Sequence, residues 1–162
     1  MTEVGELLHE AGCDEDLVAA GLLHDAVERG SLTEARLRAE MDDDISALVL
    51  ALTEDPEIAS FAERKRALRR QVEAAGARAI TIFAADKLSD IRGLRRGIAA
   101  DRESIEGRMG TTVNAMVGHY RESVAMIEAS GLDSELVAAL RAELAGLASM
   151  AAPAIPAPAS SA

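Results

Sequence analysis

The apolar residues of this chain recur at helical spacing, and no stretch alternates convincingly between apolar and polar residues as a half-buried strand does. Ala, Leu, Ile and Val supply most of the apolar residues, and aromatic residues make up only 2% of the chain. Since Ala and Leu are strong helix formers, composition agrees with the pattern. With 162 residues the chain is long enough for one domain with a single hydrophobic core. We therefore predict one all-α domain.

Glycines and clusters of acidic residues divide this helical pattern into segments. The Asp-Glu-Asp run at 14–16 suits the positive end of a helix dipole, and Gly30 and Gly76 end helical stretches. We expect helices at 2–11, 14–30, 33–41, 42–52, 61–76, 77–96, 111–129 and 133–147, with an irregular or broken segment at 97–110. Residues 150–162 are rich in Ala, Pro and Ser without periodicity, so we predict a folded domain at 1–149 followed by a disordered tail.

The chain is acidic, with 28 Asp and Glu residues against 17 Lys and Arg residues and a net charge of −11. This charge disfavours nonspecific binding to nucleic acid or to anionic membranes. No apolar run approaches the roughly 20 residues that span a bilayer, and the first residues do not resemble a signal peptide. The single cysteine, Cys13, requires no oxidising compartment. We therefore expect a cytoplasmic protein that binds neither nucleic acid nor membranes.

The segment AGLLHDAVERG at 20–30 places a histidine and acidic residues inside an apolar helical run. On a helix His24 and Glu28 share one face, and Asp25 lies beside them. Burying a carboxylate costs several kcal/mol unless a partner compensates, and a divalent metal ion is one such partner. A histidine with adjacent carboxylates suits Mn²⁺, Fe²⁺ or Zn²⁺. Taken alone, however, the pair is explained more simply by helix-end chemistry or a buried salt bridge.

A second segment, AITIFAADKLSDIRGL at 79–94, again places acidic residues in a strongly apolar helix. Asp86 and Asp90 are four residues apart and therefore lie on one helical face. Two helices that each bury an acid can share a site between them, whereas facing acids without a cation would repel each other. The two segments together favour a shared site between their helices.

These motifs, LVAAGLLHDAVE and then FAADKLSDIRGL, resemble those of the HD-domain superfamily. More narrowly, they are similar to the hydrolase domain of RelA/SpoT-type enzymes and to the small alarmone hydrolases. The segments ERKRALRRQVEAAGARA and HYRESVAMI resemble the small hydrolases as well, so that the resemblance covers most of residues 2–147. It implies an HD-domain helical bundle.

The resemblance also implies a metal-dependent pyrophosphohydrolase. The divalent metal of that family is Mn²⁺, and its substrates are the alarmones, guanine nucleotides with four or five phosphates. Matched to the family's motifs, His24, Asp25 and Asp86 are metal ligands, and Glu28 is the glutamate that positions or activates the attacking water. In such a site the metal acidifies water and a nearby carboxylate steers the nucleophile towards phosphorus.

Three positions depart from the family's pattern. The family's first histidine ligand falls just before Met1, so we expect either a chain that begins too late or a site without that ligand; His9 is expected to be a surface or rim residue. Arg29 stands where the family has an aspartate, and Asp90 where it has an asparagine that contacts substrate. We hypothesise either that Arg29 and Asp90 form an ion pair in the substrate pocket, or that the site has drifted.

Lys65 is a third candidate for substrate binding, within a basic cluster at 64–70 that could face a polyphosphate. A solvated helix face paired with Glu63 and Glu73 explains this cluster more simply. Tyr120 matches an aromatic position late in the family domain, and core packing explains it more simply than a contact in the pocket. Two further functions remain open: an HD hydrolase of another nucleotide, and a non-catalytic HD domain that binds a nucleotide or a partner protein.

Overall fold

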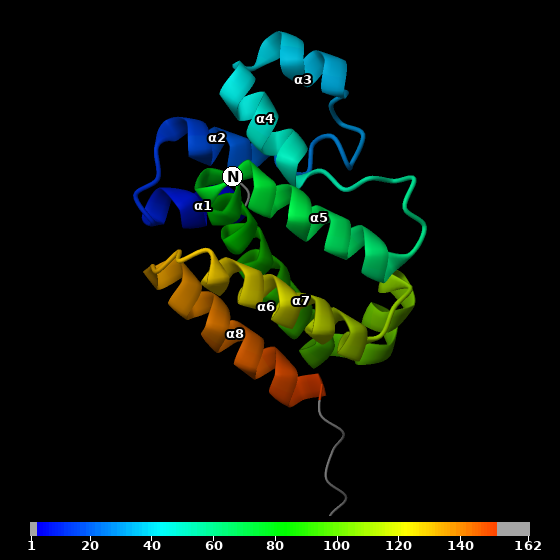
Figure 1. Cartoon of the computed structure of the whole chain (residues 1–162). Helices are drawn as coiled ribbons and strands as arrows, with labels where there is room; N and C mark the ends of the chain where they lie inside the picture. Colours follow the sequence, from blue (N-terminus) through cyan, green and yellow to red (C-terminus); the bar gives the residue numbers. More distant parts are fainter. Residues whose placement is uncertain (1–2, 152–162) are drawn as a thin grey trace, which may run out of the picture.

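The computed structural model describes residues 3–151, which form eight helices and no strand (Figure 1). The prediction of an all-α fold is therefore confirmed. The helices are α1 (Glu3–Glu10), α2 (Glu15–Leu23), α3 (Glu34–Glu40), α4 (Asp43–Leu52), α5 (Phe61–Ala75), α6 (Ala77–Met109), α7 (Val113–Ala129) and α8 (Glu135–Ala151).

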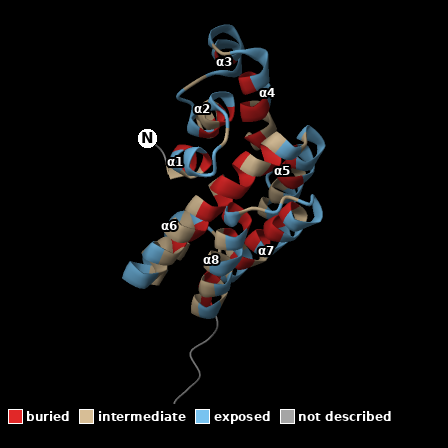
Figure 2. Ribbon diagram, turned by 90° about the vertical axis from the view of Figure 1, so that its left-hand side faces the viewer, coloured by how far each residue is buried: buried red, intermediate tan, exposed pale blue. Residues whose placement is uncertain are grey.

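Helix α6 is the centre of the molecule and contacts α1, α2, α4, α5, α7 and α8. Its N-terminal half is apolar on most sides, and Ile82, Phe83 and Ile91 are fully buried there. The buried residues run through the middle of the molecule, along α4, α5, α6 and α7 (Figure 2). A helix that is apolar on most sides is covered by its neighbours. Asp86 of the second motif is therefore held inside the bundle, whereas the side chain of Asp90 is 44% exposed.

Two glycines allow α1 and α2 to approach each other closely. A Cβ atom on Gly21 would lie 2.3 Å from Cδ1 of Leu8, and one on Gly5 would lie 2.4 Å from Cδ2 of Leu22. Leu8 is fully buried, so it has no free space into which to move. The glycines therefore fix the position of α2, and with it the position of His24 directly after this helix.

The end of α2 differs from the prediction. The α-helix ends at Leu23, and residues 24–30 continue as turns rather than as a helix to Gly30. The carbonyl oxygen of Ala26 accepts hydrogen bonds from the amide of Leu32 (3.0 Å) and the hydroxyl of Ser31 (2.9 Å), which ends the helical ladder. The argument that His24 and Glu28 share one face of a regular helix is therefore wrong.

Helix α6 is longer than predicted. It continues through the segment at 97–110 to Met109, interrupted only at Asp101, where the backbone is extended (φ −163°, ψ 99°). The Asp101 carboxylate accepts a hydrogen bond from the amide of Ser104 (3.0 Å), as an N-cap does for a new helix. The predicted break is thus present as a single capped kink. Gly110, in the left-handed conformation, ends the helix.

The last helix also ends slightly later than predicted. Helix α8 continues to Ala151, and Leu140 and Leu147 on it are fully buried. The predicted tail falls, from residue 152 onwards, outside the described residues. Among the helices of residues 3–151, none is both long and apolar enough to cross a membrane.

Candidate metal centre

His24 follows the last residue of α2 and is buried, with 7% of its surface exposed. Its Nδ1 atom lies 2.7 Å from the carbonyl oxygen of Gly21. A carbonyl oxygen only accepts hydrogen bonds, so Nδ1 carries the proton of the neutral ring. Nε2 is therefore left with its lone pair, in the tautomer that suits a metal ligand.

The Nε2 atom faces two carboxylates, one from its own turn and one from α6. It lies 3.2 Å from Oδ1 of Asp25 and 3.3 Å from Oδ1 of Asp86. Two ligands that bind one ion at right angles, each at about 2.1 Å, are roughly 3.0 Å apart. These two separations are thus close to those of neighbouring ligands on a divalent ion.

The outer oxygen of each carboxylate is held by a cation. Oδ2 of Asp25 accepts from Arg29 at 2.5 Å, and Oδ2 of Asp86 lies 2.7 Å from Nζ of Lys87. Each acid therefore has one oxygen fixed by a positive charge and the other turned towards His24. Hydrogen bonds of this kind orient metal ligands.

The charges of this cluster stabilise one another. Burial lowers the pKa of His24, but the carboxylates of Asp86 and Asp25 outweigh burial and raise it to about 9. Burial raises the pKa of Asp86, yet Lys87 and His24 reverse this and hold it well below its usual range. Without a metal, the ring is therefore protonated at neutral pH, and a cation replaces that proton when it binds.

Lys87 is the ion-pair partner that sequence reasoning missed. Its side chain is buried, and its Nζ atom lies 2.7 Å from both Asp86 and Asp90. The hypothesis that Arg29 and Asp90 form an ion pair is wrong, because Arg29 pairs with Asp25 and Asp90 with Lys87. Lys87 is a charged residue inside the apolar run of the second motif, and such a residue indicates a buried ion pair.

A cavity of ≈340 Å³ opens beside the cluster. The candidate residues His24, Asp25, Arg29, Asp86 and Asp90 all line it. The structure thus brings the three predicted ligands and two of the predicted substrate-binding residues to one cavity.

Glu28, in contrast, lines a neighbouring cavity of ≈390 Å³ together with Glu54 and Arg64. Its Oε1 atom accepts from the amide of Glu54 at 2.5 Å. Burial raises the pKa of Glu28, and the charges of Glu54 and Asp25 add to this against the opposing effect of that amide and of Lys65. The residue is therefore a carboxyl group with a raised pKa, close enough to Asp25 to be affected by its charge.

The basic cluster on α5 pairs with residues other than those predicted. Arg64 and Lys65 both bind Glu54, and Arg69 binds Glu122, rather than Glu63 or Glu73. Glu54 was not a candidate in the sequence, because nothing in the local pattern shows that the segment after α4 turns towards α5.

Two aromatic residues of α7 are enclosed near this cluster. Tyr120 is buried, as its core-packing explanation predicts, and burial raises the pKa of its hydroxyl. His119 is also buried, and burial together with Lys87 and Lys65 lowers its pKa to about 2. His9 is exposed on α1, as expected.

The donor chemistry of His24, Asp25 and Asp86 fits a divalent ion, since one imidazole nitrogen and two carboxylate oxygens suit Mn²⁺, Fe²⁺ or Zn²⁺. The set is not closed. Within residues 3–151, no group of three or more His, Cys, Asp or Glu side chains already surrounds a position for a metal ion. The structure therefore provides two pairs of ligands, His24 with Asp25 and His24 with Asp86. To enclose an ion, the two carboxylates would have to shift towards a common position.

Comparison with known proteins identifies the class. Residues 1–102 match the HD domain family, in its RelA/SpoT-type branch, and the chain belongs to that family. HD domains typically bind divalent metals and act as phosphohydrolases, which agrees with the donor set of this site.

One solved structure extends the similarity to nearly the whole chain. The 1.85 Å crystal structure of lmo0812 from Listeria monocytogenes EGD-e is 26% identical, with a TM-score of 0.77 over 90% of this chain and 96% of that one. None of the curated proteins compared with the chain matches it.

Proposed function

We propose that this protein is a Mn²⁺-dependent pyrophosphohydrolase that removes the 3′ diphosphate from guanosine 3′,5′-bis(diphosphate) or a closely related nucleotide. The observation that carries the proposal is the position of His24 Nε2, 3.2 and 3.3 Å from inward-facing oxygens of Asp25 and Asp86. Membership of the RelA/SpoT-type HD family supports the same chemistry.

His24, Asp25 and Asp86 would hold the metal in this proposal. A bound divalent ion supplies a water of lowered pKa and a positive charge for phosphate oxygens. Lys87 and Arg29 hold the outer oxygens of the two carboxylates, so that the inner oxygens keep their direction towards His24. These residues therefore position the ligands and neutralise part of the negative charge that would repel a nucleotide.

Glu28 is the group that would take a proton from the attacking water. Its raised pKa brings it closer to neutral pH, where a general base is most effective. In the structure its carboxylate accepts from the Glu54 amide in the neighbouring cavity, so the role requires Glu28 to exchange that hydrogen bond for one to water.

The substrate would lie over the ≈340 Å³ cavity, with Arg29 and Asp90 at its wall. Lys65 does not line this cavity but a neighbouring one beside α7, where it binds Glu54, so its positive charge would act on the substrate from a distance. Asp90 stands where the family has an asparagine, and a carboxylate only accepts hydrogen bonds. This position therefore favours a ligand that donates a hydrogen bond to Asp90.

The test is release of pyrophosphate from guanosine 3′,5′-bis(diphosphate) by the purified chain with Mn²⁺. We expect turnover that a chelator abolishes. Glu28→Gln should lower kcat by about 10²- to 10⁴-fold, because the group that accepts the proton is lost, while Mn²⁺ binding is retained.

Glu63→Gln is the matched control for this variant, since Glu63 is an exposed glutamate of α5. It should leave kcat unchanged. If the parent chain hydrolyses no guanosine or adenosine polyphosphate in the presence of Mn²⁺, the proposal of an active hydrolase is wrong.

A second candidate function is a non-catalytic HD domain that binds a nucleotide. It is favoured by the absence, among residues 3–151, of a closed group of three metal-ligating side chains. This function predicts that guanosine 3′,5′-bis(diphosphate) binds but is not consumed. The same assay, run with a binding measurement, separates the two functions.

A further inference from the structure

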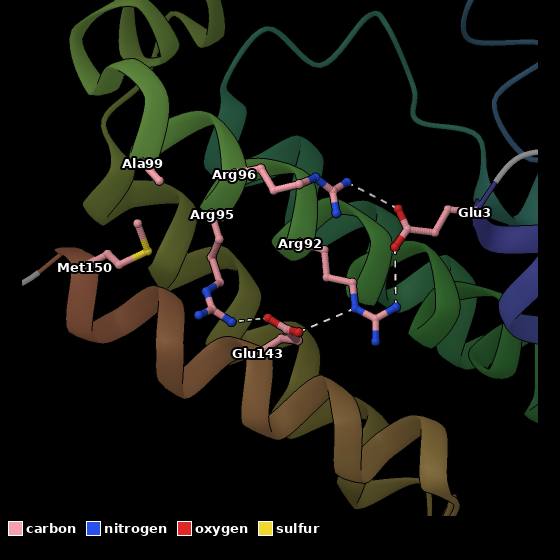
Figure 3. A pocket seen from close by; sticks show the side chains of 7 residues that line it. All are labelled: Glu3, Arg92, Arg95, Arg96, Ala99, Glu143 and Met150. Carbon is pink, nitrogen blue, oxygen red and sulfur yellow. Dashed lines mark hydrogen bonds and ion pairs between the residues drawn. The ribbon is translucent and has the colours of Figure 1, made fainter.

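A second cavity, which shares Glu3 with the cavity of His24, lies between α1, α6 and α8. It has a volume of ≈560 Å³ and contains three arginines from successive turns of α6 (Figure 3). Arg92, Arg95 and Arg96 point across it towards Glu3 on α1 and Glu143 on α8. Three guanidinium groups against two carboxylates leave a local excess of positive charge in a chain whose net charge is −11.

Two of these arginines are held loosely by their acidic partners. Arg92 lies 3.4 Å from Glu3 and 3.5 Å from Glu143, and Arg96 lies 3.4 Å from Glu3. A hydrogen bond between guanidinium and carboxylate normally closes to about 2.8 Å. The arginines on α3 do so, with Arg36–Glu40 at 2.7 Å and Arg38–Glu34 at 2.9 Å. Arg92 and Arg96 therefore have hydrogen-bonding capacity to spare.

Arg95 has a donor without a partner. Among the side chains of residues 3–151, its Nε is buried and makes no hydrogen bond, although its terminal nitrogen binds Glu143. Gly146 on α8 creates the room for this guanidinium, because a Cβ there would lie 2.6 Å from Cζ of Arg95. A side chain at position 146 would therefore displace the Arg95 guanidinium from its place at the cavity.

The remaining lining is apolar, from Ala99 and Met150. A cavity with several convergent cations and a small apolar wall suits a ligand that has a phosphate group and a less polar remainder. We propose that this cavity is a second binding site, for a phosphate-bearing small molecule held by Arg92, Arg95 and Arg96. The site needs no metal ion, and it stands independently of the proposed hydrolase activity.

Glu3 is the group that the ligand displaces. It bridges Arg92 and Arg96, and it also lines the cavity of His24, where Ser89 donates to it at 3.2 Å. An incoming phosphate competes with Glu3 for the same guanidinium groups. Removing the carboxylate should therefore strengthen phosphate binding, whereas removing an arginine should weaken it.

The experiment is calorimetric titration of the full chain with inorganic pyrophosphate in the presence of a chelator, so that no metal ion at His24 contributes. We expect one site per chain. Arg96→Gln should weaken binding by about tenfold, as expected for one charge-assisted contact, and Glu3→Gln should tighten it. Arg96 is largely exposed, so the fold does not depend on it.

Arg70→Gln is the matched control, because it removes an equal charge from the exposed surface of α5. It should leave the affinity unchanged. The proposal is overturned if the parent chain does not bind pyrophosphate, or if Arg70→Gln weakens binding as much as Arg96→Gln, since only a nonspecific charge effect would then be present. Titrations with inorganic phosphate and with guanosine diphosphate would show whether the apolar wall of the cavity contributes to binding. Tighter binding of guanosine diphosphate than of pyrophosphate supports a ligand that has a phosphate group and a less polar remainder. Binding of none of the three anions contradicts the proposal.

Discussion

His24 shows how a single backbone hydrogen bond selects the atom that a residue offers to its surroundings. Because the Gly21 carbonyl oxygen accepts a hydrogen bond from Nδ1–H, the other ring nitrogen is directed towards Asp25 and Asp86. Arg29 and Lys87 then fix the outer oxygen of each carboxylate. The direction of these five side chains follows from local contacts rather than from the metal.

The electrostatics of His24 predict how the metal-free chain responds to pH. Its pKa in the folded state, about 9, lies above the ordinary value of 6.5. The associated stability is complete below about pH 6.5 and is lost as the pH rises through about 9. We predict that the free energy of unfolding falls by up to about 3 kcal/mol over this interval. Urea unfolding of chelator-treated protein at both ends of the interval measures the change.

His24→Gln is the control, because glutamine does not titrate. Its free energy of unfolding should be lower than that of the parent at about pH 6.5 and should show a much weaker fall with rising pH. An equally steep fall in His24→Gln would assign the effect to another group and would contradict the ion-pair geometry.

Among single residues, the sequence located the acids of the site but not their partners. His24, Asp25 and Asp86 could be selected because polar residues in apolar runs are conspicuous, and the structure brings them together. Lys87 was overlooked beside Asp86, although it forms two ion pairs there. Ion pairs such as Lys65–Glu54 depend on how the chain turns between helices, and no local pattern records that.

At the scale of helices, the contact between α1 and α2 determines the position of His24 in the candidate metal centre. A Cβ on Gly5 or Gly21 would overlap a leucine of the other helix, and His24 follows three residues after Gly21. The sequence pattern correctly predicted both helices but extended α2 to Gly30. Apolar periodicity continues through 24–30, whereas the capping contacts of Ser31 and Leu32 with Ala26 end the helix earlier.

We predict that Gly21→Ala destabilises the protein. The added methyl group would meet Leu8, which is fully buried, and overpacking of this kind costs about 1–3 kcal/mol. The substitution should also displace the carbonyl oxygen that orients His24, and so weaken metal binding. The melting temperature, measured with and without Mn²⁺, reports both effects.

Gly118→Ala on α7 is the matched control, because a Cβ at that position meets nothing within 4 Å. Alanine is the better helix former, so the melting temperature should stay the same or rise. If Gly21→Ala were as stable as Gly118→Ala, the close approach of α1 and α2 would not be needed for the fold.

At the scale of the whole molecule, one central helix organises both the core and the two cavities. Helix α6 carries Asp86 and Asp90 at the His24 site and the three arginines of the second cavity. The all-α class followed from composition and periodicity, and the HD assignment followed from two motifs in order; the match to residues 1–102 confirms it. The arrangement of α1 and α8 around the arginines could not be predicted, because it depends on contacts between residues about ninety and fifty positions apart.

The account depends most on a single claim, that His24, Asp25 and Asp86 together bind a divalent ion. Titration of the metal-free chain with Mn²⁺ by calorimetry tests it, beside Asp86→Ala and with circular dichroism to verify that both proteins are helical. We predict one site per chain with a Kd of about one micromolar or tighter, which is lost in Asp86→Ala. Absence of binding to the parent chain, or equal binding to a folded Asp86→Ala, would contradict the claim.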